Sequence, residues 1–232
     1  MQLDTTPQLV APSCRLSTWR KDHLNLLSRL QLPILLNRLE LYGDGLELGV
    51  LKGEFSKSLL SNSSLSVLYS VDPWKEFGKD EYVDSNALSH EKHEKNYQIT
   101  KEVLAPFGDR SKILRMTSEE ALVEIPQSSL DFVYIDANHE YEHVKYDLVN
   151  WAEKVRVGGI IAGHDYLDDG TYYDIEGKGF TSDLNDPEVK EGCSIIRFGV
   201  KGAVDKYVLE HAYTLHLTGE TLIPSWFFIK TH

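Results

Sequence analysis

Apolar positions along the chain recur with two different periods, and this predicts strands that alternate with helices. Short apolar runs between turn residues are typical of buried strands, whereas apolar residues three or four positions apart are typical of amphipathic helices. Strands are predicted at residues 46–48, 66–71, 112–116, 131–136 and 160–162. Helices are predicted at residues 17–32, 33–42, 55–60, 141–155 and 199–211, and in the second half of residues 75–106. This order indicates an α/β protein with an open, mostly parallel sheet.

The two ends of the chain depart from this alternation. Residues 1–40 are predicted to form a loose arm and a helical extension that packs on the sheet or on a second subunit, with Pro33 opening its second helix. Residues 41–232 form the main domain, which closes with a hairpin of residues 213–218 and 225–230. Residues 167–193 are polar and glycine-rich without clear periodicity, which is typical of a lid or loop over a substrate.

Composition narrows the class of protein. The 232 residues suffice for one α/β domain with a full core. A formal net charge of −12 disfavours a nucleic acid or an anionic membrane as the main partner. Cys14 and Cys193 are too few for a disulfide framework or a zinc site. No apolar run reaches the roughly 18 residues of a membrane span, and the N-terminus lacks a signal pattern, so we expect a cytoplasmic protein.

A glycine turn after the first predicted strand is the first candidate for a binding site. Glu47 lies at the end of the apolar run, and Gly49 and Gly53 follow it before an amphipathic segment. A strand, a tight turn and a helix start form the local geometry of a nucleotide pocket in an open sheet. The spacing does not fit the dinucleotide fingerprint G-x-G-x-x-G, and the acid suits a ligand with a cationic part. A plain strand–turn–helix with incidental glycines is the alternative.

Two further strand ends carry candidate ligand-binding residues. Asp72 lies 25 residues after Glu47, close to where a ribose-binding acid ends the second strand of a nucleotide fold. Its alternative role is a turn former before Pro73. Residues 117–121 start a helix with a hydroxyl cap and acids in the first turn, at the edge where a nucleotide base would lie. Capping alone explains these residues equally well.

One histidine pair is a weaker candidate for metal binding. His90 and His93 are three residues apart, as two ligands on one helical face would be. Charged residues surround both, so we favour a solvated surface.

The richest stretch delivers acids and imidazoles to the ends of two neighbouring strands. Asp136 ends one predicted strand and His139 follows in the loop, while His164 and Asp165 end the next strand. Carboxylates with imidazole support suit a divalent cation. A histidine with a pKa near neutrality suits a general base for a hydroxyl proton. In the alternative interpretation the acids cap helices and the histidines form hydrogen bonds within their loops.

The order of these parts resembles the class I methyltransferases that use S-adenosylmethionine, and more closely the branch called methyltransferase family 24. The resemblance covers residues 40–230 and implies a Rossmann-like, seven-stranded, mostly parallel sheet with helices on both faces and an antiparallel last strand. The matching segments are Glu47-Leu-Gly-Val-Leu-Lys-Gly53, Val71-Asp-Pro-Trp74, Asp131-Phe-Val-Tyr-Ile-Asp-Ala-Asn-His-Glu-Tyr-Glu142, Asp147-Leu-x-x-Trp151, Gly158-Gly-Ile-Ile-Ala-Gly-His-Asp-Tyr166 and Gly199-Val-x-x-Ala-Val-Asp205.

The resemblance also implies roles for individual residues. Glu47 and Gly49 would line the methionine end of the cofactor, Asp72 would bind the ribose hydroxyls, and Ser118 and Glu119 would lie near the adenine. The remaining cofactor residues that it implies are Val50, Gly53, Phe55, Ser56, Pro73, Trp74, Asp136 and His139.

A metal centre is implied by similarity to magnesium-dependent sugar O-methyltransferases of macrolide biosynthesis. Asp136 and Asp165 would be ligands, and His139 would be the catalytic base beside Asp136. The chain departs from that pattern at His164, where the family has an acid. Because histidine binds magnesium poorly, a metal site of Asp136, His164 and Asp165 would hold Mg²⁺, another divalent cation, or none.

Three functions therefore compete at this stage. The first is methylation of a hydroxyl on a small molecule, such as a vicinal diol of a sugar or a glycosylated natural product. The second is a nicotinamide-dependent dehydrogenase, which the absent G-x-G-x-x-G disfavours. The third is a non-catalytic protein that keeps the fold. The acceptor and a homo-oligomeric state stay open.

Overall fold

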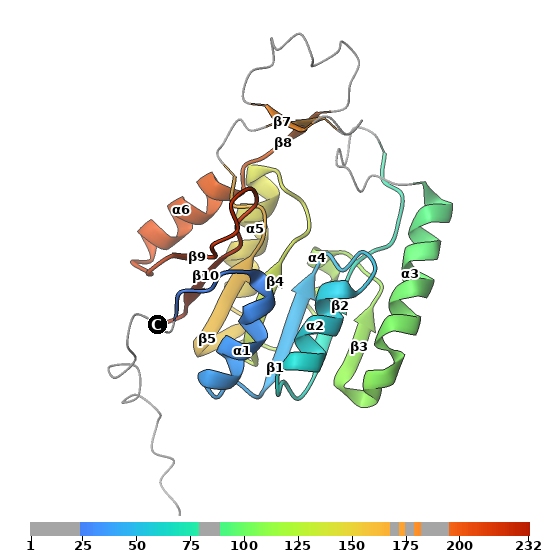
Figure 1. Ribbon diagram of the computed structural model, residues 1–232, viewed down its shortest axis with the longest axis horizontal. Helices are drawn as coiled ribbons and strands as arrows, with labels where there is room; N and C mark the ends of the chain where they lie inside the picture. Colours follow the sequence, from blue (N-terminus) through green and yellow to red (C-terminus); the bar gives the residue numbers. More distant parts are fainter. Residues whose placement is uncertain (1–23, 79–88, 168–171, 175–178, 182–194) are drawn as a thin grey trace, which may run out of the picture.

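The chain folds around a seven-stranded sheet, as seen in a computed structural model that describes residues 24–78, 89–167, 172–174, 179–181 and 195–232 (Figure 1). The order of the strands is β3-β2-β1-β4-β5-β10-β9. Their bounds are β1 (Asp44–Leu48), β2 (Leu68–Val71), β3 (Ser111–Leu114), β4 (Leu130–Ile135), β5 (Val155–Gly163), β9 (His216–Leu217) and β10 (Trp226–Ile229). Strands β1 to β5 pair in parallel, whereas β10 is antiparallel to both β5 and β9. This confirms the predicted fold class and the terminal hairpin.

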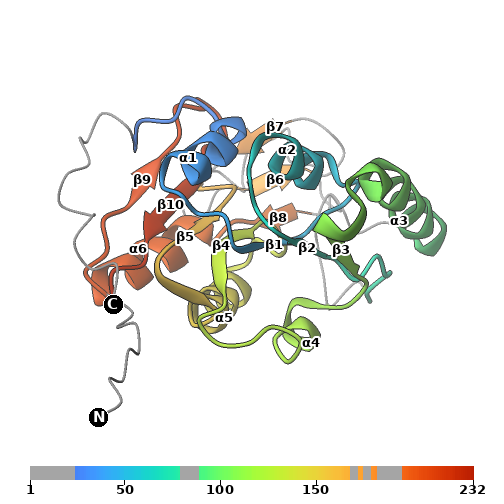
Figure 2. The ribbon, with the colours of Figure 1, turned by 90° about the horizontal axis from the view of Figure 1, so that it is seen from below.

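Helices cover both faces of the sheet (Figure 2). Their bounds are α1 (Leu32–Arg38), α2 (Glu54–Asn62), α3 (His90–Leu104), α4 (Ser118–Ala121), α5 (Tyr141–Ala152) and α6 (Val200–Glu210), with 3-10 turns η3 (Arg29–Gln31) and η4 (Ala105–Arg110). Helices α1, α2 and α3 pack on one face and α4, α5 and α6 on the other. A hydrophobic core lies on each face of the sheet, and β4 contributes to both. Phe132 and Tyr134 point to one face, and Val133 and Ile135 point to the other. A parallel strand buried on both faces explains its continuous apolar run.

The register of the central strands brings their carboxyl ends to one edge. Leu48 of β1 pairs with Ile135 of β4, and Ile135 pairs with Gly163 of β5. The residues that follow these three positions therefore start their loops side by side, as open α/β sheets require for a ligand site.

A second, three-stranded sheet is formed by β6 (Tyr172–Asp174), β7 (Gly179–Thr181) and β8 (Ile195–Arg197), with β6 in the middle. Figure 1 shows it beyond the carboxyl ends of the main strands. Much of the predicted lid, residues 167–193, lies outside the described residues, and its role stays a prediction.

The N-terminal extension differs from its prediction. Residues 17–23 lie outside the described part, and residues 24–31 form no α-helix but contain the 3-10 turn η3. Leu27 and Leu30, expected on a buried apolar face, are 74% and 58% exposed. The Leu26 carbonyl accepts the Gly219 N–H at 2.8 Å, which ties this segment to the β9–β10 loop instead of into an α-helix.

Two element boundaries also differ. Pro33 does lie in the first turn of a helix, but α1 ends at Arg38 rather than near residue 42. Strand β5 starts at Val155, five residues before the strand predicted at 160–162, and therefore includes Gly158 and Gly159. A Cβ at Gly159 would lie 2.8 Å from the Asp131 carbonyl oxygen, so glycine lets β5 run close beside β4 there. Within the described part of the chain, every helix is too short or too polar to cross a membrane.

Candidate active site

The glycine turn between β1 and α2 is shaped by one close backbone approach. Gly49 has a φ of +82°, and a Cβ on it would lie 1.8 Å from the carbonyl oxygen of Asp136. Only glycine combines that conformation with that space. The β1 turn and the β4 loop are thereby in direct contact.

Asp72, at the end of β2, holds this turn in place. Its Oδ2 accepts the N–H groups of Val50 and Leu51 at 3.0 and 2.9 Å, and its Oδ1 accepts the N–H of Trp74 at 2.7 Å. The buried Trp74 side chain donates from Nε1 to the Leu51 carbonyl at 2.8 Å. Burial raises the pKa of Asp72, and these backbone hydrogen bonds oppose the shift.

A cavity of about 340 Å³ opens between this turn, the start of α4 and the start of α5. Seven of the predicted cofactor residues line it, namely Gly49, Asp72, Pro73, Trp74, Ser118, Glu119 and Asp136. Among the described residues, six others that were predicted do not line it, namely Glu47, Val50, Gly53, Phe55, Ser56 and His139. The cofactor roles of both groups stay predictions.

Glu47 lies below the turn instead of in the cavity. Its carboxyl group is buried and accepts a very short hydrogen bond from Ser56, whose Oγ also lies 2.8 Å from Ser70 Oγ. Burial raises the pKa of Glu47 to about 8, although the Ser56 hydrogen bond opposes this shift. Glu47 thus belongs to a buried polar cluster that supports the turn.

Ser118 is fixed by α5, the helix opposite it. Its hydroxyl donates to Asp147 and accepts from Nε1 of Trp151 at 2.7 Å. The predicted hydroxyl cap is present, because Thr117 and Glu120 form a reciprocal capping box at the start of α4. Burial raises the pKa of Asp147 to about 6, against the effect of the Ser118 hydrogen bond.

Several residues that line this cavity were not predicted from the sequence. His143, Tyr146 and Asp147 line it from α5. They lie on the polar side of α5, whereas the helix was predicted from the spacing of its apolar residues.

The two histidines of α3 differ from each other in their exposure, and the prediction of a solvated surface is corrected for one of them. His90 is exposed, as expected, but His93 is buried and lines the cavity together with Asp72. Burial lowers the pKa of His93, while the nearby Asp72 opposes that shift. The prediction of a solvated pair was wrong for His93 because α3 packs one of its polar faces against the cavity.

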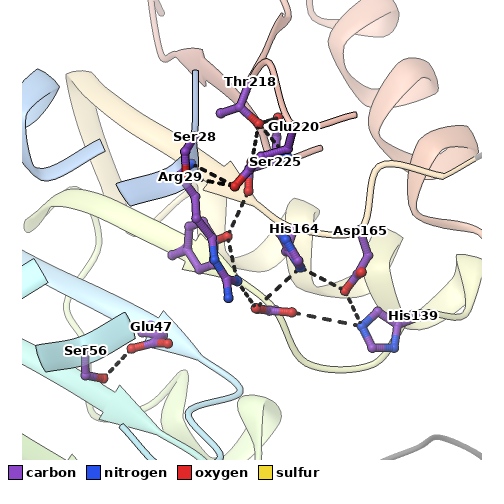
Figure 3. Close-up of polar contacts among 12 residues, drawn as sticks. Ser28, Arg29, Glu47, Ser56, His139, His164, Asp165, Thr218, Glu220 and Ser225 are labelled. Atoms are coloured by element: carbon purple, nitrogen blue, oxygen red, sulfur yellow. Dashed lines mark hydrogen bonds and ion pairs between the residues drawn. The ribbon is translucent and has the colours of Figure 1, made fainter. Parts of the chain in front are cut away.

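The loops after β4 and β5 bring the two predicted clusters together (Figure 3). His139 Nε2 lies 2.7 Å from Asp165 Oδ2, and His164 Nδ1 lies 3.3 Å from the same oxygen. Asp136 Oδ1 lies 4.0 Å from His139 Nε2, and Asp136 Oδ2 lies 3.9 Å from His164 Nδ1. The backbone of Asp165 has a φ of +53°, a conformation that is rare outside glycine and is often found at functional sites.

These groups tune one another electrostatically. Burial alone would raise the pKa of Asp165, but the hydrogen bonds from His139 and His164 outweigh it and lower the pKa below its usual range. Burial and the charge of Asp165 together raise the pKa of Asp136. Asp165 is therefore the firmly ionised acid of the pair.

Arg29 is a member of this site that sequence reasoning did not find. It comes from η3 in the N-terminal extension, and its Nη1 lies 3.1 Å from Asp136 Oδ2 and 3.4 Å from the hydroxyl of Tyr134. Arg29 and Asp136 are 107 residues apart in the chain. No local motif indicates that an arginine in the N-terminal extension contacts the end of a distant strand.

The donor atoms fit a divalent cation in type and spacing. Asp136, His139 and Asp165 each offer one ligand atom, and these atoms lie within 4.8 Å of one another. Two carboxylates with an imidazole suit an ion that accepts nitrogen more readily than Mg²⁺ does. This group contains His139 in place of the predicted ligand His164, which lies beside it.

The buried Glu47 predicts a pH-dependent stability. Its pKa is raised from 4.5 to about 8, so the folded state holds one more proton than the unfolded state between these pH values. The free energy of unfolding should therefore fall as pH rises through this range, with a limiting slope of about 1.4 kcal/mol per pH unit. Urea unfolding of Glu47→Gln from pH 5 to 8 should show a flatter profile than the wild type. Glu54→Gln, at an exposed site in α2, serves as the control and should keep the wild-type profile. A Glu47→Gln profile as steep as that of the wild type would show that Glu47 is ionised in the folded protein.

The fold and the glycine turn define a class of protein. An antiparallel β10 between β5 and β9, with a turn after β1 facing an acid after β2, is the architecture of class I S-adenosylmethionine-dependent methyltransferases. Residues 46–166 match the family model described as "Methyltransferase domain", methyltransferase family 24. The chain belongs to this family.

Individual relatives are more distant. The protein R132 of Acanthamoeba polyphaga mimivirus, which is named as uncharacterized, is 26% identical over 125 residues, covering 53% of this chain and 51% of that protein. The chain spans about half or less of the length of the curated relatives it matches.

Two solved structures share the fold. One is an O-methyltransferase from Bacillus cereus in complex with S-adenosylhomocysteine, with 18% identity, a TM-score of 0.54, and coverage of 87% of this chain and 80% of that chain. The other is the O-methyltransferase TomG from Streptomyces achromogenes in complex with S-adenosylmethionine, with 14% identity, a TM-score of 0.52, and coverage of 88% and 79%.

Proposed function

We propose that this chain transfers the methyl group of S-adenosylmethionine to a hydroxyl group of a small molecule, such as a sugar or a glycosylated natural product. The observation that carries the proposal is the position of Asp136. It lines the cavity beside the glycine turn and also belongs to the cluster of His139, His164 and Asp165. A methyl donor in that cavity would therefore lie next to the acids and imidazoles.

In this proposal the cavity holds the cofactor. Asp72 would accept the ribose hydroxyls, since a carboxylate has about four acceptor positions and three are used by backbone N–H groups. Ser118 and Glu119 would lie at the adenine, and the backbone at Gly49 would face the methionine part. The acidic lining of Asp72, Glu119 and Asp147 suits a cationic sulfonium better than a pyrophosphate.

The proposed reaction mainly requires that the acceptor hydroxyl is positioned against the methyl group. The sulfonium is already a strong electrophile, so the protein has to hold a hydroxyl oxygen in line with the methyl group. His139 would accept the hydroxyl proton, and Asp165 at 2.7 Å from Nε2 would stabilise the imidazolium that forms. A divalent cation held by Asp136, Asp165 and His164, with His139 kept as the base, would supply Lewis-acid polarisation of the acceptor oxygen.

The acceptor side of the proposal rests on charge and placement. The net charge of −12 supports a small-molecule acceptor rather than a nucleic acid or a membrane, and the low cysteine content supports a cytoplasmic setting. Residues 167–193 follow β5 and include β6 and β7 of the small sheet, and we assign them to a cover over the acceptor.

Calorimetric titration with S-adenosylhomocysteine, with and without Mg²⁺, tests the cofactor. We expect micromolar binding by the wild type and a loss of about 100-fold or more in Asp72→Ala, because the variant loses both the ribose partner and the anchor of the turn. Asp109→Ala, at a fully exposed aspartate, should bind like the wild type. A wild type that binds no S-adenosylhomocysteine under either condition would refute the proposal and favour a non-catalytic protein.

A further inference from the structure

Arg29 binds the same carboxylate of Asp136 that a divalent cation at this site would use. Its guanidinium contacts Asp136 Oδ2 at 3.1 Å, the carboxylate that both lines the cofactor cavity and belongs to the acid and histidine cluster. Arginine keeps its positive charge at any pH at which the protein is folded. Asp136 therefore already has a cationic partner from its own chain.

The arginine is held in this position by its surroundings (Figure 3). Its backbone N–H donates to Glu220 Oε1 at 3.3 Å, and the hydroxyl of Ser28 donates to the same oxygen at 2.9 Å. Thr218 donates to the other carboxylate oxygen of Glu220 at 2.5 Å, which fixes this acid in the β9–β10 loop.

The Arg29 side chain also contacts two aromatic residues. Its guanidinium lies 5.2 Å from the centre of the Phe55 ring, in the range of a cation–π contact, and it contacts the Tyr134 hydroxyl. The side chain is 31% exposed. An arginine with this many partners is preorganised toward Asp136 and differs from a solvated surface arginine.

Charge then decides what else Asp136 can bind. A divalent ion binds carboxylate oxygens at about 2.0 to 2.6 Å, so an ion on Asp136 would share this carboxylate with the guanidinium. Two positive groups at that separation in a partly buried site repel each other strongly. The second acid, Asp165, is engaged by two imidazoles and offers little compensation.

We propose that Arg29 is the built-in cation of this site and that Arg29 and a divalent metal ion are mutually exclusive partners of Asp136. A metal ion binds only when the guanidinium leaves Asp136. The N-terminal extension and the β9–β10 loop, which carries Glu220, therefore control metal binding. The proposal rests on the metal centre considered under the proposed function, but it does not depend on methyl transfer itself.

Binding of Mn²⁺, followed by the loss of the electron paramagnetic resonance signal of the free ion, tests this proposal without an activity assay. Arg29→Met keeps an apolar stem against Phe55 and removes the charge. We expect it to bind Mn²⁺ about tenfold more tightly than the wild type, or more. The double variant Arg29→Met with Asp136→Asn should lose this gain.

Two controls make the result interpretable. Arg38→Met removes an exposed arginine at the end of α1 and should bind Mn²⁺ like the wild type. Arg29→Gln is a second variant of the same site, and thermal unfolding of each variant shows that it is folded.

Three results would overturn the proposal. These are equal Mn²⁺ affinity in the wild type and in both Arg29 variants, no Mn²⁺ binding by any of them, or a gain that persists in the double variant. S-adenosylhomocysteine binding by the same wild-type sample separates these results from a failure of the proposed function, because the cofactor cavity does not include Arg29.

Discussion

His139→Ala is expected to lower the rate of methyl transfer by about two to four orders of magnitude, the usual contribution of a positioned general base. The imidazole is the group that Asp165 holds at 2.7 Å and orients beside Asp136. Release of S-adenosylhomocysteine from S-adenosylmethionine, in the presence of a panel of sugars and nucleoside diphosphate sugars, measures the rate. The first acceptor that supports turnover by the wild type is then used for the variants.

The same variant separates catalysis from binding. His139 does not line the cofactor cavity, so its removal should leave the affinity for S-adenosylhomocysteine nearly unchanged. His90→Ala removes an exposed histidine on α3 and should keep the wild-type rate. If His139→Ala turned over as fast as His90→Ala, His139 would not be the base. If it lost cofactor binding, His139 would belong to the cofactor site, as the sequence resemblance implies.

Gly49→Ala is expected to abolish S-adenosylhomocysteine binding and to lower the free energy of unfolding by about 2 kcal/mol or more. The new Cβ would lie 1.8 Å from the Asp136 carbonyl oxygen, a distance that only a shift of the backbone can relieve. That shift would separate the β1 turn from the β4 loop and disturb the Asp72 contacts at the same time. Calorimetry and urea unfolding measure the two effects.

Gly108→Ala provides a matched control for this variant. Gly108 also has a positive φ, of +53°, but a Cβ on it would meet nothing within 4 Å. The ψ of Gly108 is −128°, so Gly108→Ala should lose only the cost of this sparsely populated backbone conformation, about 1 to 3 kcal/mol, and should keep cofactor binding. A Gly49→Ala protein as stable as Gly108→Ala, with cofactor binding intact, would contradict the role of close approach at Gly49.

Local sequence was informative wherever the structure depends on neighbours in the chain. The apolar run of β4, the capping box at Thr117 and the hairpin that ends in β10 all follow from spacing within a few residues. The meeting of Asp136 and His139 with His164 and Asp165 also followed, because neighbouring parallel strands end at one edge. The family resemblance implied a seven-stranded, mostly parallel sheet with an antiparallel last strand, and the sheet has these features.

Local sequence failed where long-range packing overrides it. Leu27 and Leu30 have α-helical spacing, yet their segment is bonded to Gly219 and does not form an α-helix. His93 has charged neighbours in sequence, yet α3 turns it into the cavity. In both cases the partner lies far away in the chain, and a local pattern carries no information about it.

The sequence by itself determined the α/β order of elements, the glycine turn, and the acids and histidines at the strand ends, because periodicity and turn chemistry are local properties. Only the tertiary structure decided that Glu47 lies buried below the turn with Ser56, and that Asp72 anchors the turn through backbone N–H groups. It alone brought Arg29 to Asp136, since an ion pair between residues 107 positions apart depends on how the N-terminal extension packs against the β9–β10 loop.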